Sequence, residues 1–254
     1  MSFGIVAFAG SSLAGGDKTK SSMEVTARMT HLVLFFVGSV YFINGLALLG
    51  LIEPRASAPL NIFVGTLLLG VTGYLVFPLS DLSTPNSLQT VFESIGYLLF
   101  ALTFLYVGVI NLTGHANDGL GWYCGWATIV AVCLAICNLA FGDVKSAALW
   151  MVWTVVFAAF FALIVLKVNR FDRATGWFVI VAGFTTCFIP GGLLILGEWN
   201  VLPNVIVVIL ELGTLAFFGI FLLRISDLKT HFPYKVVNVE GADADDARQI
   251  VPNK

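Results

Sequence analysis

The sequence predicts an all-α polytopic membrane protein, and two observations support that prediction. Hydrophobic residues make up 58% of the 254 residues and charged residues only 11%, whereas soluble domains have about 45–50% and about 25%. The apolar residues also occur in seven blocks, each near the length of about 17–25 residues that a helix needs to cross a bilayer. Lipid offers no hydrogen-bond partner to an exposed backbone, so each block is expected to be helical.

The connections between the blocks are short, which makes neighbours in sequence antiparallel neighbours in space. We expect residues 1–30 to form an extramembrane N-terminal arm, residues 31–228 the transmembrane domain, and residues 229–254 a polar C-terminal tail. The tail has too few apolar residues to form a core. The spans are placed at His31–Leu51, Pro59–Phe77, Leu88–Leu112, Gly119–Ala140, Ser146–Val168, Thr175–Trp199 and Pro203–Leu228.

Lysine and arginine predict the orientation, because cytoplasmic flanks of membrane helices are enriched in these residues. Seven positive residues lie on the side of the C-terminal flank and four on the other side. We therefore expect a cell-membrane protein with its N-terminus outside and its C-terminus in the cytoplasm. The two groups are Arg55, Lys167, Arg170, Arg173, Arg224, Lys229 and Lys235, against Lys145, Lys18, Lys20 and Arg28.

Several polar residues fall within the predicted spans. A carboxylate at mid-bilayer costs about 2.5–3.5 kcal/mol on insertion scales, so these residues should face the protein interior. For the asparagines, hydrogen bonding between helices is favoured over the lining of a pathway. Glu211 has no obvious cationic partner in its own span. The full set is Asn44, Asn61, Glu93, Asn111, Asn138 and Glu211.

No enzyme, metal site or cofactor is expected. The motifs HExxH, GxGxxG and GxxxxGK[ST] do not occur, and the three histidines lie far apart in the sequence. A net charge of −2 argues against a nucleic-acid partner. A retinal protein is excluded because the last span has no lysine near its middle.

Two rows of aromatic residues form the candidate functional feature. Phe100 and Phe104 are four residues apart, and Trp150, Trp153 and Phe157 are spaced by three and four. Each row therefore occupies one face of a helix. Two facing rows would line a flat slot, but the pattern by itself favours packing between helices over a slot.

Four segments, in order, resemble the AmiS/UreI family of urea and short-chain amide channels. The resemblance implies a six-helix channel bundle, with one pore in each subunit of a homohexamer, and it leaves the seventh, C-terminal span as an addition. The segments are VGSVYFINGLALLGLIEPRASAPLNIFVG (Val37–Gly65), LLFALTFLYVGVIN (Leu98–Asn111), ALWMVWTVVF (Ala148–Phe157) and GWFVIVAGFTTCFIPGGLLIL (Gly176–Leu196).

The resemblance also implies the pore-lining residues. Polar groups at the pore mouths would be Asn44, Thr103 and Asn111. The selectivity residues would be Phe100, Phe104, Trp150, Trp153, Val156, Phe157, Val37 and Tyr41.

The expected function is facilitated diffusion of urea and short-chain aliphatic amides across the lipid bilayer. Phe157 and Phe104 stand where the acid-gated member of the family has tryptophan and tyrosine, which favours less polar amides. The predicted outer loops at 78–87, 141–145 and 199–203 contain no histidine, so acid gating is not expected.

One alternative is a proton-coupled secondary transporter of small monocarboxylates such as acetate. The segment SAPLN at 57–61 faintly resembles the NPAPLGL signature of that class, although the leading asparagine and the glycine are missing. Such a carrier needs a titratable group in its path, and Glu93 or Glu211 would supply it.

Overall fold

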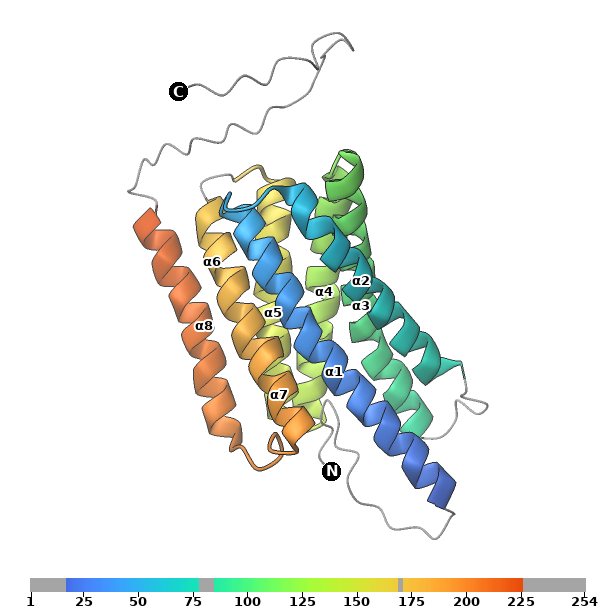
Figure 1. The fold of residues 1–254 in the computed structure, drawn as a ribbon. Helices are drawn as coiled ribbons and strands as arrows, with labels where there is room; N and C mark the ends of the chain where they lie inside the picture. Colours follow the sequence, from blue (N-terminus) through green and yellow to red (C-terminus); the bar gives the residue numbers. More distant parts are fainter. Residues whose placement is uncertain (1–16, 78–84, 169–170, 226–254) are drawn as a thin grey trace, which may run out of the picture.

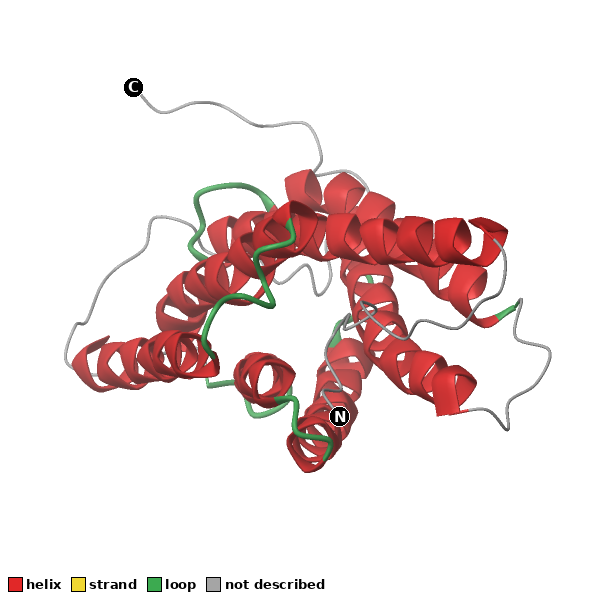
Figure 2. Cartoon of the chain, turned by 90° about the horizontal axis from the view of Figure 1, so that it is seen from below, coloured by secondary structure: helices red, strands yellow, loops and turns green. Residues whose placement is uncertain are grey.

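The computed structural model describes residues 17–77, 85–168 and 171–225, and regular structure in these ranges is entirely helical (Figure 2). This confirms the predicted all-α polytopic membrane protein. Each expected span overlaps one observed span, with ends that differ by five residues or fewer. The described residues contain 7 candidate membrane spans: Met29–Leu48, Pro54–Val76, Thr90–Thr113, Asp118–Ala140, Val144–Ile164, Asp172–Leu196 and Asn204–Arg224.

The first six spans form a closed ring that follows the order of the sequence. Each helix from α1 to α6 packs against the next one, and α6 returns to pack against α1 (Figure 1). Short connections force this order, because consecutive helices can then only be neighbours. The six are α1 (Asp17–Leu48), α2 (Pro54–Val76), α3 (Pro85–Thr113), α4 (Asp118–Ala140), α5 (Val144–Ile164) and α6 (Asp172–Gly183).

Helix α1 begins at Asp17, within the segment expected to be an extramembrane arm. Its apolar span begins only at Met29, so the helix continues N-terminally beyond the apolar stretch. Residues 1–16 and the predicted polar tail at 229–254 lie outside the described residues, as do Arg170, Lys229 and Lys235.

Two pairs of glycines allow α1 and α6 to close the ring. A Cβ atom at Gly38 would lie 3.0 Å from the carbonyl oxygen of Gly183, and one at Gly45 would lie 2.7 Å from that of Gly176. In membranes, helices associate through such close approach of small residues, since lipid removes the hydrophobic drive between them. Larger residues at Gly38 or Gly45 would push the two helices apart.

The sixth span contains a π-helical turn in its middle. Helix α6 ends at Gly183, the turn η2 covers Phe184–Phe188, and α7 covers Ile189–Leu196. Pro190 has no N–H, and its ring would clash with the carbonyl group of Thr186 in a regular α-helix. The wider turn, in which the N–H of Ile189 bonds to the carbonyl of Phe184, accommodates the proline. Helix and turn together bury Thr185, Thr186 and Cys187.

The seventh span, α8 (Asn204–Ile225), lies outside the ring, at the edge of the bundle beside α6 (Figure 1). It contacts α5, α6 and η2. Its face toward the ring includes Val207, Glu211, Thr214 and Phe218, all of which are buried. The opposite face exposes large apolar side chains, which fits contact with lipid.

Candidate functional site

Phe100 of α3 is the centre of an aromatic cluster inside the ring. Its ring centroid lies 5.0 Å from that of Trp153 and 5.5 Å from that of Phe157, both on α5. The ring of Trp150 stacks on it at 6.0 Å, and Tyr41 of α1 lies 6.2 Å away. Offset and edge-to-face arrangements of this kind are worth about 0.5–1.5 kcal/mol per pair beyond the buried area. The two predicted aromatic rows therefore face each other across the bundle.

A hydrogen bond to the sixth span fixes the position of the Trp153 indole. The indole Nε1 donates to the hydroxyl of Thr186 at 2.8 Å, and that hydroxyl donates to the carbonyl of Ala182 at 2.6 Å. Both Trp153 and Thr186 are buried. The π-helical turn thus presents Thr186 to the indole and fixes the rotation of the ring about its side-chain bonds.

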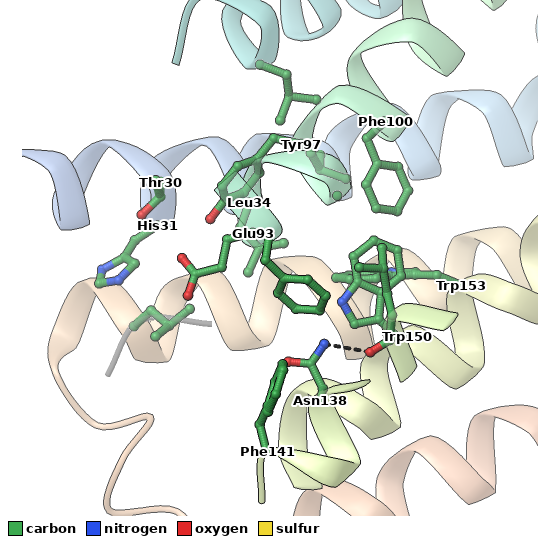
Figure 3. Close-up of a pocket in the computed structure, with 16 residues that line it drawn as sticks. Thr30, His31, Leu34, Glu93, Tyr97, Phe100, Asn138, Phe141, Trp150 and Trp153 are labelled. Atoms are coloured by element: carbon green, nitrogen blue, oxygen red, sulfur yellow. Dashed lines mark hydrogen bonds between the residues drawn. The ribbon is translucent and has the colours of Figure 1, made fainter. Parts of the chain in front are cut away.

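A cavity of about 60 Å³ lies on the side of the cluster toward the beginning of α1, and we refer to it as the His31 cavity. His31 and Glu93 lie at one end, while Phe100, Trp150 and Trp153 lie at the other (Figure 3). At about 10–15 Å³ per water, the cavity has room for about four waters. Its walls are mostly apolar, and the remaining lining residues are Thr30, Leu34, Val37, Leu68, Phe92, Gly96, Tyr97, Leu134, Asn138, Phe141 and Leu194.

A second cavity of about 30 Å³, the Asn44 cavity, lies on the other side of the cluster. Its lining is mostly apolar, and the residues with a hydroxyl or amide group are Tyr41, Asn44 and Thr103. On the same scale it has room for about two waters. Its other lining residues are Phe100, Phe104, Val107, Leu120, Cys124, Val156, Phe157, Phe160 and Val179.

Phe100 lines both cavities and separates them along the axis of the bundle. On α3, the residues before Phe100 line the His31 cavity and those after it line the Asn44 cavity. Helices α1 and α5 divide in the same way: Val37 and Trp153 lie on one side, and Tyr41 and Val156 on the other. The site is therefore a pair of vestibules in line, closed from each other by stacked rings.

The structure brings together every residue predicted for the aromatic constriction. Val37, Trp150 and Trp153 line the His31 cavity, and Phe100 lines both cavities. The remaining four line the Asn44 cavity: Tyr41, Phe104, Val156 and Phe157. Two of the three predicted mouth residues, Asn44 and Thr103, line the same cavity.

The third predicted mouth residue, Asn111, lines neither of these two cavities. Its amide donates to the hydroxyl of Ser57 at 3.0 Å and so joins α3 to α2. Asn61 of α2 continues this contact: its amide exchanges two hydrogen bonds with that of Asn44, at 2.7 and 3.0 Å. In an apolar surrounding, a helix–helix partner satisfies these amides better than a site facing lipid.

The sequence reasoning missed the contribution of α4 and of the C-terminal half of α2. Leu134 and Asn138 on α4, and Leu68 on α2, complete the wall of the His31 cavity. The two leucines are ordinary residues for a membrane helix, so no local signal distinguishes them, whereas Asn138 was noted in the sequence as a polar residue within a span. Gly96 of α3 also lines this cavity, and a Cβ atom there would lie 2.6 Å from the Trp150 ring, so a larger residue would displace that ring.

Comparisons with known proteins identify the family to which the chain belongs. The family profile described as "AmiS/UreI family transporter" matches residues 29–198, which include α7 and end before α8. The "Putative transporter protein AmiS2" of Rhodococcus erythropolis is 31% identical over 173 residues, covering 68% of this chain and 82% of that protein. The "Acid-activated urea channel" of Helicobacter pylori is 27% identical over 197 residues, covering 67% of this chain and 100% of that protein.

A solved structure is similar over the same region. The cryo-EM structure of the Helicobacter pylori urea channel in the closed state matches with a TM-score of 0.59 and 28% sequence identity, covering 66% of this chain and 98% of that chain. The match extends over most of the described bundle and confirms the resemblance seen in four sequence segments. The chain therefore belongs to the AmiS/UreI family.

Proposed function

We propose that this protein is a membrane channel for the facilitated diffusion of urea and short-chain aliphatic amides. The observation that carries the proposal is the pair of in-line cavities separated by the rings around Phe100. Relatives named as a urea channel and as an amidate-substrate transporter support this class of solute.

The aromatic constriction suits a planar, neutral and dipolar solute. Ring faces hold a flat molecule by dispersion and stacking, which are weak for each atom pair but add up over the whole plate. An ion that enters the same space loses its hydration without compensation, at a far higher cost. The constriction is therefore expected to pass urea and acetamide while excluding ions.

The Asn44 cavity offers few replacement hydrogen bonds to a solute that has passed the rings, because the amide of Asn44 already exchanges two hydrogen bonds with Asn61 and the hydroxyl of Thr103 donates to the carbonyl of Leu99. The amide of Asn44 and the hydroxyl of Thr103 lie in its lining. Phe104 and Phe157 carry no hydrogen-bonding group, so few other polar contacts are available there. Less polar amides are therefore expected to permeate at least as readily as urea.

Passage requires a displacement of the Phe100 ring, because it touches both cavities and packs on Trp150, Trp153 and Phe157. The arrangement is that of a closed constriction. A transient rotation of Phe100 about its side-chain bonds would join the two vestibules.

We further propose a homohexamer with one such pathway in each subunit, oriented with the N-terminus outside. Among the described residues, Arg55, Lys167, Arg173 and Arg224 lie at the end of the bundle where α8 finishes, and Lys18, Lys20, Arg28 and Lys145 lie at the other end. The preference for a cytoplasmic Asn44 cavity and an outward-facing His31 cavity therefore rests on the count over the whole sequence, seven positive residues against four.

Osmotic swelling of proteoliposomes in urea or acetamide tests the proposed function. We expect the proteoliposomes to swell much faster than empty liposomes. The rate should not saturate with solute concentration and should not depend on a proton gradient. Uptake of acetate driven by a pH gradient, without amide-dependent swelling, would instead identify the monocarboxylate carrier. The monocarboxylate carrier would need a carboxylate at the constriction, and the described residues place none there. Glu93 lines the His31 cavity away from the rings, and Glu211 lines neither cavity.

A further inference from the structure

Helix α8 lies beyond the residues that match the family and yet brings a buried carboxyl group to the ring. The family profile ends at residue 198, and α8 begins at Asn204. Glu211, in the middle of α8, is 2% exposed. A carboxyl group at such depth is costly in a membrane protein and is typically retained for a specific contact.

Glu211 contacts the π-helical turn of the sixth span. Its Oε2 accepts a hydrogen bond from the hydroxyl of Thr185 at 3.2 Å. The hydroxyl of Thr214, one turn further along α8, lies 3.2 Å from that of Thr185 and completes the cluster. The other carboxyl oxygen of Glu211, Oε1, is buried and has no hydrogen-bond partner among the described residues. The contact with Thr185 is therefore the polar link that this carboxyl group makes to the ring.

The same π-helical turn also binds Trp153 of α5. Thr186, the neighbour of Thr185, accepts the indole hydrogen bond of Trp153 at 2.8 Å. The π-helical geometry buries both threonines, so one hydroxyl reaches α8 and the next one reaches α5. Single π-helical turns within α-helices are rare and occur frequently at functional sites.

We propose that Glu211 is a positioning residue: by anchoring Thr185 it sets the place of Thr186 and thereby the position of the Trp153 indole at the constriction. This inference rests on the proposed channel function and extends it, because it gives α8 a role in solute selectivity. Loss of the anchor lets the turn and the indole relax, which widens the slot and favours larger amides.

Packing of α8 alone is the competing explanation, and the chain offers a matched control for it. Phe218 of α8 stacks on Phe178 of α6, with ring centroids 4.2 Å apart, and its side chain has no hydrogen-bonding group that could join the polar cluster. Phe218→Leu therefore weakens the packing of α8 and leaves Glu211, Thr185 and Thr214 in place.

The experiment compares the permeability of butyramide with that of urea, measured by proteoliposome swelling. Thr186→Val removes the hydrogen bond to Trp153 directly and serves as the reference for a released indole. Glu211→Leu and Thr185→Val remove the anchor, while Glu211→Gln keeps an oxygen that accepts from Thr185. Leucine at position 211 also removes an unpartnered buried oxygen, so this variant is expected to insert normally.

We expect Glu211→Leu and Thr185→Val to raise the butyramide-to-urea ratio by about two- to tenfold, in the same direction as Thr186→Val. Glu211→Gln and Phe218→Leu should stay within about 1.5-fold of the original protein. An unchanged ratio in Glu211→Leu beside a changed ratio in Thr186→Val would overturn the proposal. An equal change in Phe218→Leu would also overturn it, because packing would then suffice. If Glu211→Leu is not recovered from membranes, Thr185→Val decides by the same criteria.

A second readout does not depend on conduction. The chain has 6 tryptophans, and replacing the other five with phenylalanine leaves Trp153 as the sole indole fluorophore. Glu211→Leu should shift its emission maximum as Thr186→Val does, and Phe218→Leu should not. If the original protein conducts neither urea nor amides, the proposed function fails, whereas the emission comparison still tests the anchoring of Trp153.

Discussion

The ring of Phe100 meets the indole of Trp153 edge to face, with centroids 5.0 Å apart and ring planes at 80°. The indole cannot turn away freely, because its nitrogen is bound to Thr186 on the π-helical turn. A contact between α3 and α5 is thus fixed by a third element, the sixth span. Trp153 therefore connects the sixth span to Phe100, so a change in the sixth span can alter the position of the aromatic rings.

Trp153→Ala should change the ratio of acetamide to urea permeability by about two- to tenfold, because the edge-to-face contact with Phe100 is worth about 0.5–1.5 kcal/mol. Swelling rates of proteoliposomes in the two solutes measure the ratio, and immunoblotting of membranes measures expression, which should change less. Identical ratios in the variant and the original protein would argue against the aromatic slot.

Phe100→Ala should join the two cavities, since Phe100 is the residue that lines both. Urea permeability should rise, and solutes larger than butyramide should begin to pass. Leu102→Ala, at an exposed position of the same helix, is the control and should leave permeation unchanged. Reduced permeation in Phe100→Ala, in protein with an unaltered melting temperature, would contradict a blocking role for this ring.

Asn61→Leu should lower the stability of the bundle. Asn61 exchanges two hydrogen bonds with Asn44 and donates a third to the carbonyl of Ser57. At about 0.6 kcal/mol for each contact between helices, the loss should amount to about 1–2 kcal/mol. Thermal unfolding in detergent measures it. The double variant Asn44→Leu/Asn61→Leu should be more stable than Asn61→Leu alone, because it leaves no unpaired amide. An additive double variant would show that the two amides act independently.

Conduction should vary by less than about twofold between pH 5 and pH 7.5, since the aromatic rings at the constriction do not titrate in this range. His31 lines the His31 cavity at the end away from the aromatic rings, and its Nε2 has no hydrogen-bond partner among the described residues. His31→Ala therefore serves as the comparison. A steep rise on acidification would refute the prediction, and loss of that rise in His31→Ala would locate the gate at this histidine.

The orientation can be tested with single introduced cysteines at opposite ends of the bundle. Ala116 and Glu198 are exposed, in the connections after α3 and after α7. A membrane-impermeant maleimide should label Glu198→Cys in intact cells and Ala116→Cys only after permeabilisation. The original protein controls for its native cysteines, of which Cys133 is exposed. The reverse pattern would place the N-terminus in the cytoplasm.

The sequence alone determined the spans and the two aromatic rows. Hydropathy and helical periodicity act within one segment, so the rows at Phe100 and Trp153 could be read without knowledge of any neighbour. The resemblance added the expectation that these rows face each other, which the ring geometry agrees with.

Only the tertiary structure decided which polar residues line the two cavities and how the indole of Trp153 is held. Asn111 and Ser57 are 54 residues apart, and Trp153 and Thr186 are 33 apart. Such contacts depend on the rotation of each helix about its axis and on the π-helical turn before Pro190. Those features arise from packing between helices, and a hydropathy pattern carries no information about the rotational setting of one helix against another.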